Sequence, residues 1–174
     1  MKKEIQDAIN NQIKEETFSA YLYLSMAAYF ERENLAGAAT WMKSQAQEEM
    51  VHSMKFFDFL NQKGGVVKLQ AIPQPDHDFK SIVDVFEQAL EHEKFITSKI
   101  NDLYDLAAKE GDRSFQVFLN WFVEEQDEEE DTVNQILGKL DGLDLKSKHA
   151  VLMIDSELGQ RPLIANMPTE GGGE

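Results

Sequence analysis

The spacing of apolar residues divides most of the chain into long amphipathic segments. Residues 4–30, 35–63, 81–109 and 113–140 place apolar side chains at every third or fourth position, the period of an α-helix with one buried face. A shorter segment, 146–158, has the same pattern and predicts a fifth helix. The pattern therefore predicts an all-α protein built around four long helices.

Residues that begin and end helices separate these segments. Gly64-Gly65 and Gly111 follow the second and third segments, where glycine commonly ends a helix. Asn34 and Asp112 precede the second and fourth segments, and we expect each to cap the N-terminus of the helix that follows.

The connection over residues 66–80 is long and contains Pro73 and Pro75, which make a helix unfavourable there. About 16 extended residues span about 53 Å. The helix predicted over residues 35–63 is about 43 Å long. The connection can therefore run the length of the bundle and start the next helix parallel to the preceding one, which predicts a four-helix bundle with a long crossover and a short fifth helix.

Composition and charge narrow the classes of function. The 174 residues fit one domain over residues 1–158, and the Gly- and Pro-containing residues 159–174 are expected to be a disordered tail. The net charge of −15 argues against nucleic acid and anionic membrane partners and is compatible with attracting cations. Cysteine is absent, which excludes disulfides and thiolate sites. With no apolar leader and no membrane-spanning run, we expect a cytoplasmic protein.

Each long segment places one glutamate on its apolar face: Glu16, Glu49, Glu93 and Glu129. Glu16 precedes the turn at Phe30–Asn34 by nearly the same stretch of chain by which Glu49 follows it. The other two acids lie equally far before and after Gly111. Because equal distances from a turn give equal heights in an antiparallel hairpin, the four acids are predicted to meet at one level of the bundle.

The four acids raise the question of what neutralises them inside a core. Each desolvated charge costs several kcal/mol unless it is paired. His52 follows Glu49 by three positions and points in the same direction from its helix. Carboxylate oxygens with one imidazole nitrogen, and no sulfur, suit a pair of iron or manganese ions and tolerate zinc.

The di-iron carboxylate bundles use a Glu from each of two helices and a Glu-x-x-His motif from each of the other two. This chain has Glu49-x-x-His52 but carries Gln126-x-x-Glu129 on the fourth segment. With that departure, residues 4–158 resemble a non-haem bacterial or archaeal ferritin. The matching residues are Glu16, Tyr23, the run Ala46-Gln47-Glu48-Glu49-Met50-Val51-His52, His92-Glu93, and Leu119-Asn120-Trp121-Phe122-Val123-Glu124-Glu125-Gln126-Asp127-Glu128-Glu129-Glu130.

The resemblance implies a hollow 24-subunit shell that oxidises Fe(II) with dioxygen or hydrogen peroxide and stores ferric mineral inside. By the family's pattern, the first iron takes Glu16, Glu49 and His52. The second takes Glu49, Glu93 and Glu129, so that Glu49 bridges the two ions.

The resemblance also implies roles around these ligands. Gln126 and Tyr23 would hydrogen-bond to the ligands, and Gln126 is counted with the metal-site residues. Trp121 is similar to an aromatic residue that supplies an electron in the family. A third iron site would use Glu48, Glu125, Glu128 and Glu129.

Other interpretations remain open from the sequence. The outer acids also fit a solvated helix face, and His77 and His149 fit surface positions. A rubrerythrin-type peroxidase or di-iron oxidase would normally have a second Glu-x-x-His, and a bacterioferritin would use Met50 to bind haem. Because bacterioferritins also expect a histidine on the fourth helix, no haem is expected. A DNA-coating mini-ferritin is disfavoured by the fifth helix, and a metal-free bundle would bury four unpaired acids.

Overall fold

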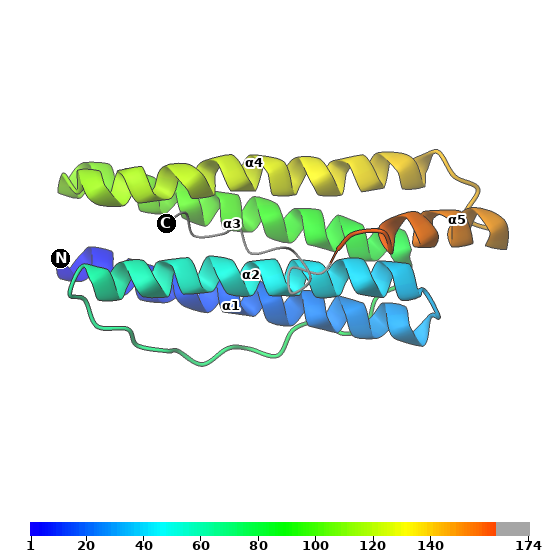
Figure 1. Cartoon of the computed structure of the whole chain (residues 1–174), viewed down its shortest axis with the longest axis horizontal. Coiled ribbons are helices and arrows are strands. Elements are labelled where there is room, and N and C mark those ends of the chain that lie inside the picture. The colour runs from blue at the N-terminus through cyan, green and yellow to red at the C-terminus, as the bar shows by residue number, and fades with distance from the viewer. Residues whose placement is uncertain (163–174) are drawn as a thin grey trace, which may run out of the picture.

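The computed structural model describes residues 1–162, and this part of the chain forms five helices joined by loops (Figure 1). They are α1 (Lys3–Arg32), α2 (Ala36–Gln62), α3 (Ile82–Glu110), α4 (Arg113–Asp141) and α5 (Lys148–Leu158). The predicted all-α architecture, including the short fifth helix, is confirmed. Residues 163–174, most of the tail expected to be disordered, lie outside the described part.

The first four helices form two antiparallel hairpins, α1 with α2 and α3 with α4 (Figure 1). The connection between α2 and α3 runs the length of the bundle beside α1, so that α3 starts at the same end as α2 and runs parallel to it (Figure 1). This is the crossover predicted from the length of the connection.

Side chains of α1 hold the crossover in an extended course. Asn10 donates to the carbonyl of Val66 and accepts from the amide of Lys68, at 3.0 and 2.6 Å. Further along α1, the Ser25 hydroxyl donates to the carbonyl of Asp76 at 2.6 Å. These bonds satisfy backbone groups that have no strand partner, which explains how a long connection without secondary structure stays on the bundle.

The helix ends follow the sequence signals with one exception. Gly111 ends α3 in the left-handed region at φ 71°, and the Asp112 carboxylate accepts from the amide of Phe115 at 3.1 Å to cap α4. The prediction that Asn34 caps α2 is wrong. Asn34 has φ 60° and follows the end of α1, while Leu35 precedes α2 without a side-chain cap. An asparagine tolerates the left-handed turn that ends one helix as well as the cap that starts the next.

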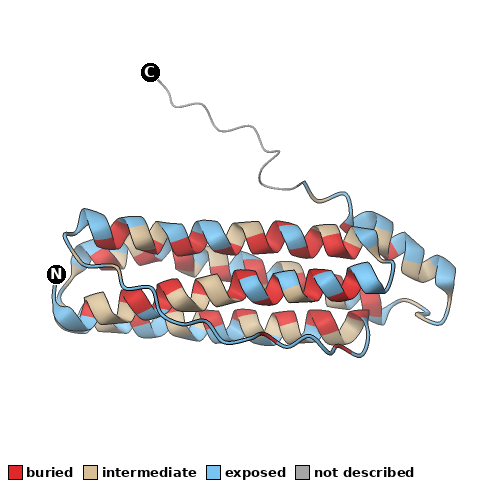
Figure 2. Cartoon of the chain, turned by 90° about the horizontal axis from the view of Figure 1, so that it is seen from below, coloured by how far each residue is buried: buried red, intermediate tan, exposed pale blue. Residues whose placement is uncertain are grey.

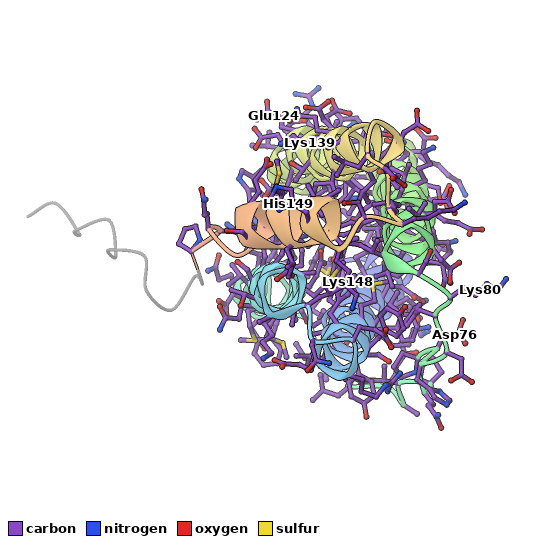
Figure 3. All side chains as sticks on the ribbon, turned by 90° about the vertical axis from the view of Figure 1, so that its right-hand side faces the viewer. Asp76, Lys80, Glu124, Lys139, Lys148 and His149 are labelled. Carbon is purple, nitrogen blue, oxygen red and sulfur yellow. The ribbon has the colours of Figure 1, made fainter. Side chains whose placement is uncertain are left out.

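The uncapped start of α2 is satisfied from α5. Asp155 on α5 accepts a hydrogen bond from the amide of Ala38 at 2.8 Å. The approach is so close that a Cβ atom on Gly37 would lie 1.7 Å from the carbonyl oxygen of Asp155. Seen end-on, α5 crosses the bundle end between α4 and α2, with His149 exposed (Figure 3).

The core consists of two apolar clusters, one in each half of the bundle. One cluster includes Phe30, Met42 and Phe86, and the other includes Ile9 and Phe56. Buried residues recur along all four long helices (Figure 2). Between the two clusters, every long helix contributes buried polar side chains instead of apolar ones. No helix within residues 1–162 combines the length and apolarity needed to cross a membrane.

Candidate metal centre

The polar layer between the two apolar clusters contains the four predicted acids. They are all buried, and so are the histidine and the glutamine predicted to act with them: Glu16, Glu49, His52, Glu93, Gln126 and Glu129. The helical period that buries each apolar seam also turns these side chains inward, and the two hairpins bring them to one level. The sequence therefore folds so that acids from four helices meet between two apolar halves.

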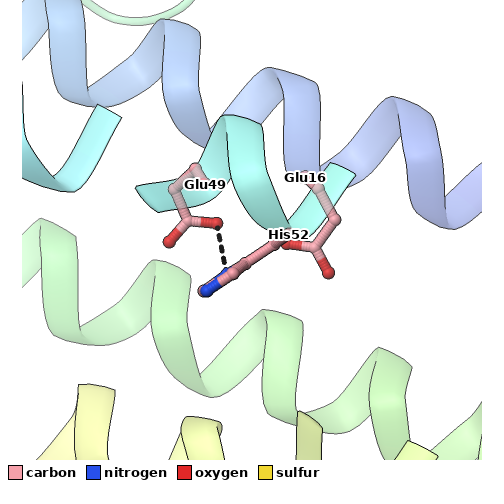
Figure 4. A group of neighbouring side chains, drawn as sticks. All are labelled: Glu16, Glu49 and His52. Carbon is pink, nitrogen blue, oxygen red and sulfur yellow. Dashed lines mark ion pairs between the residues drawn. The ribbon is translucent and has the colours of Figure 1, made fainter. Parts of the chain in front are cut away.

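Glu16, Glu49 and His52 form the tightest group. One ligand atom from each lies within 4.8 Å of the other two, and they come from α1 and α2 (Figure 4). The Nδ1 atom of His52 is 3.5 Å from Oε2 of Glu49, longer than a typical hydrogen bond. The three side chains thus surround one point without satisfying one another.

Neutral side chains donate hydrogen bonds to three of the four acids. Gln12 donates to Oε1 of Glu16 at 2.8 Å, and Gln45 donates to Oε2 of Glu129 at 2.8 Å. On the third acid, the Tyr23 hydroxyl donates to Oε1 of Glu93, and Gln126 donates to its Oε2 at 3.2 Å. Among the described residues, Glu49 alone of the four accepts no such bond.

Several buried ligand atoms have no hydrogen-bond partner within residues 1–162. They are Oε2 of Glu16, Oε1 of Glu49 and Nδ1 of His52. A buried polar atom without a partner is destabilising, and most folded proteins avoid it. Two carboxylate oxygens and one imidazole nitrogen around one point are a donor set suited to a divalent ion, so the residues present fit a metal.

The electrostatics of the metal-free centre agree with this fit. Burial raises the pKa of Glu93 to about 7. Burial, with the charges of Glu93 and Glu48, raises the pKa of Glu129 to about 8. Burial also raises the pKa of Glu16, and it raises that of Glu49 well above its ordinary value. Glu93 and Glu129 therefore hold protons for part of the time near neutral pH, and a divalent ion would replace them.

The basic and phenolic groups of the centre also have shifted pKa values. Burial lowers the pKa of His52, but the carboxylates of Glu125, Glu49 and Glu16 outweigh burial and raise it to about 11. Burial and the charge of Glu93 raise the pKa of Tyr23 well above its ordinary value, so the phenol stays a hydrogen-bond donor. His52 is accordingly protonated without metal and must lose that proton to become a ligand.

An outer group adjoins the centre on α4. His52, Glu125 and Glu129 offer ligand atoms within 4.8 Å of one another, and Glu125 is half-buried. Glu48 is also half-buried, but its carboxylate pairs with the guanidinium of Arg161. Glu128 is exposed and outside the group. Of the acids expected at a third site, the structure brings together Glu125 and Glu129, with Glu48 held by a cation.

Two aromatic side chains flank the centre. The ring of Trp121 meets the ring of His52 edge-on, with centroids 5.4 Å apart, and Trp121 is 37% exposed. Lys55 lies over the indole at 4.0 Å from its centroid. On the other side, Tyr23 is fully buried and meets Trp41 edge-on at 6.4 Å.

Three residues that contact the acids have no role predicted from the sequence: Gln12, Gln45 and Arg161. Gln12 and Gln45 each lie four positions before a seam acid, on the same helix face. A glutamine on an apolar helix face, one turn before a buried acid, is the sequence pattern that could have indicated a polar role for these two residues. Arg161 contacts a residue 113 positions away, and no spacing in the sequence indicates that contact.

Comparisons by family model, by sequence and by structure all find proteins that are similar to this chain. Residues 6–143 match the family model described as a ferritin-like domain. The chain is 42% identical over 159 residues to a bacterial non-haem ferritin of Bacteroides fragilis, covering 91% of this chain and 98% of that protein. It is 40% identical to a probable bacterial non-haem ferritin-like protein of Haemophilus influenzae, covering 91% and 96%. An open-pore ferritin structure from Archaeoglobus fulgidus superimposes with a TM-score of 0.91 at 42% identity, covering 93% and 99%.

Proposed function

Since the chain belongs to the ferritin family and is similar to its non-haem members, we propose that it oxidises Fe(II) at the centre and stores ferric mineral. The observation that carries the proposal is the polar layer, where four buried acids and one histidine leave ligand atoms without partners. Iron is the substrate and cargo in this proposal. Buried ligand atoms without hydrogen-bond partners destabilise the fold, and such destabilisation is expected at a site that must bind an ion transiently.

Each iron has a ligand set in the proposal. The first ion takes Glu16, Glu49 and His52, and the second takes Glu49, Glu93 and Glu129. The hydrogen bonds of two acids support this division, because Glu16 and Glu129 each give one oxygen to a glutamine donor and keep the other for metal. Glu49 accepts none of these bonds, which suits a carboxylate that bridges two ions with both oxygens.

Oxidation removes one electron from each of two Fe(II) ions. With dioxygen as acceptor, two electrons and two protons give hydrogen peroxide; with hydrogen peroxide as acceptor, they give two waters. Protons displaced from His52 and the acids when Fe(II) binds are available nearby for this reduction. Tyr23 and Gln126 orient Glu93 through hydrogen bonds to its two oxygens.

Storage requires a closed assembly. We propose a shell of 24 chains, the assembly that the family resemblance implies. Such a shell has 24 times the 19.9 kDa mass of one chain, which a measurement of particle mass in solution detects directly. A measured mass of one or two chains at working concentration would contradict storage in a cage and favour a small di-iron oxidase.

Stopped-flow absorbance after mixing with Fe(II) tests the catalytic part of the proposal. Glu49→Ala should remove the fast phase, because both ions lose a ligand, whereas His52→Ala should chiefly impair one ion. The matched control is Glu87→Ala, which removes an exposed acid from α3 and should leave the rate unchanged. Oxidation by Glu49→Ala at the wild-type rate, above the uncatalysed background, would refute the assignment.

A further inference from the structure

The chain after α5 folds back onto α2. The Arg161 guanidinium donates to Oε2 of Glu48 and lies 4.8 Å above the ring of Trp41. One residue on, the carbonyl of Pro162 accepts from the Ser44 hydroxyl at 3.0 Å. Trp41, Ser44 and Glu48 are three, four or seven positions apart and so share one face of α2. Arg161 therefore has a stacking partner and an anionic partner on a single helix face.

The docking of α5 fixes where this segment begins. Gly159 directly follows α5, and a Cβ atom there would lie 3.0 Å from Cα of Gly37 at the start of α2. Asp155 accepts from the amide of Ala38 in the same region. Because the end of α5 and the start of α2 are in near contact at Gly159 and Gly37, Arg161 is only two residues from a closely packed position. Its contact with Glu48 is therefore set by the fold and not by a free tail.

Glu48 is one of the acids that the family resemblance assigns to a third iron site, beside the outer group of His52, Glu125 and Glu129. It is adjacent to Glu49 in sequence, and its charge contributes to the raised pKa of Glu129. Glu125 and Glu129 already offer oxygens within 4.8 Å of each other. An ion that used the Glu48 carboxylate as well would compete with Arg161 for it, because Oε2 of Glu48 is engaged by the guanidinium.

The pair has the properties of an exchangeable contact. The side chains of Arg161 and Glu48 are 24% and 26% exposed, so solvent partly screens their attraction. Within residues 1–162, Nη1 of Arg161 is buried without a hydrogen-bond partner. The guanidinium thus satisfies only part of its hydrogen-bonding capacity in this position.

We propose that Arg161 is the built-in counter-cation of Glu48, which competes with a metal ion for that carboxylate and weakens the outer site. The inference rests on the proposed function, because the outer site adjoins the centre described above. An ion that takes both oxygens of Glu48 requires the guanidinium to move aside. The consequence is that a third ion is held less tightly than the central two, which favours its onward passage.

Calorimetric titration of the intact protein with Zn(II), which is redox-silent, tests the inference. The outer ion is identified as the class of zinc lost in Glu125→Gln. Arg161→Gln should tighten that class by about fivefold, the effect of a partly exposed charge pair, and leave the two central ions unchanged. Arg113→Gln, which removes an exposed arginine at the start of α4, should change neither class. Arg161→Lys keeps the charge without the planar stacking and should fall between wild type and Arg161→Gln.

The outcomes separate this inference from the proposed function. An outer class equally tight or weaker in Arg161→Gln, with the central ions intact, overturns the role of Arg161 alone. An outer class absent from wild type overturns it as well. The proposed function would instead be overturned if wild type did not bind two zinc ions tightly, or if Glu49→Ala still bound them. If Arg161→Gln does not keep the wild-type particle size, Arg161→Lys is compared with wild type instead. Equal zinc affinities of the outer site in these two proteins would then overturn the inference.

Discussion

Binding of two zinc ions to the centre should release at least about two protons per chain at pH 7. With pKa values of about 8 and about 7, Glu129 is about nine-tenths and Glu93 about half protonated at that pH. His52, with a pKa of about 11, is nearly fully protonated. A metal ion must displace these protons to use the groups as ligands.

The pH dependence has a definite sign. Because the acids have raised pKa values, lowering the pH to 6 protonates them further, and the release should rise to at least about three protons. If the four acids and His52 had ordinary pKa values, zinc binding would release less than about one proton at pH 6 and still less at pH 7. The same raised values mean that metal-free stability falls as pH rises from about 4.5 to about 8, since the folded chain binds more protons than the unfolded one.

Isothermal titration in two buffers of different ionisation enthalpy measures the release at each pH. Glu49→Gln should bind zinc more weakly and release fewer protons. Glu87→Gln, an exposed acid on the helix that carries Glu93, should match wild type. A release below about half a proton at pH 7, with two zinc ions bound, would mean that the acids are already ionised before zinc binds. That result would contradict their burial together in the core.

Three further experiments test other features of the protein. Tyr23→Phe removes the hydroxyl that donates to Glu93 and should slow Fe(II) oxidation about fivefold, with two zinc ions still bound; an unchanged rate would deny it a positioning role. Gly37→Ala places a methyl group against the backbone of α5 and should destabilise its docking by about 1–3 kcal/mol, seen as faster hydrogen exchange in residues 148–158. The control Gly138→Ala meets no atom within 4 Å and should not accelerate that exchange. Purified protein mixed with haem should show no Soret band; one haem per two chains, lost in Met50→Leu, would indicate a bacterioferritin.

The positions of the four acids were predictable because they depend on repeating geometry. The 3.6-residue period indicates which face is buried, and equal distances from Gly111 give Glu93 and Glu129 the same height. The same arithmetic relates Glu16 to Glu49 across the first turn. No contact between particular side chains had to be known for these acids to be placed in one layer.

The hydrogen-bond partners were not predictable from spacing. Gln12 and Gln45 each precede a seam acid by four positions, yet Gln12 donates to its neighbour Glu16 while Gln45 donates across the bundle to Glu129. Rotamers and packing between helices decide this choice, and a one-dimensional pattern carries no information on either. The contact of Arg161 with Glu48 depends likewise on how α5 docks at Gly37.

Crystals soaked with Zn(II) and measured at the zinc absorption edge would show whether the polar layer binds two metal ions. We expect two anomalous peaks per chain in the polar layer, one among Glu16, Glu49 and His52 and one among Glu49, Glu93 and Glu129, with Glu49 between them. Peaks confined to exposed acids such as Glu128, with the polar layer empty at saturating zinc, would contradict this expectation.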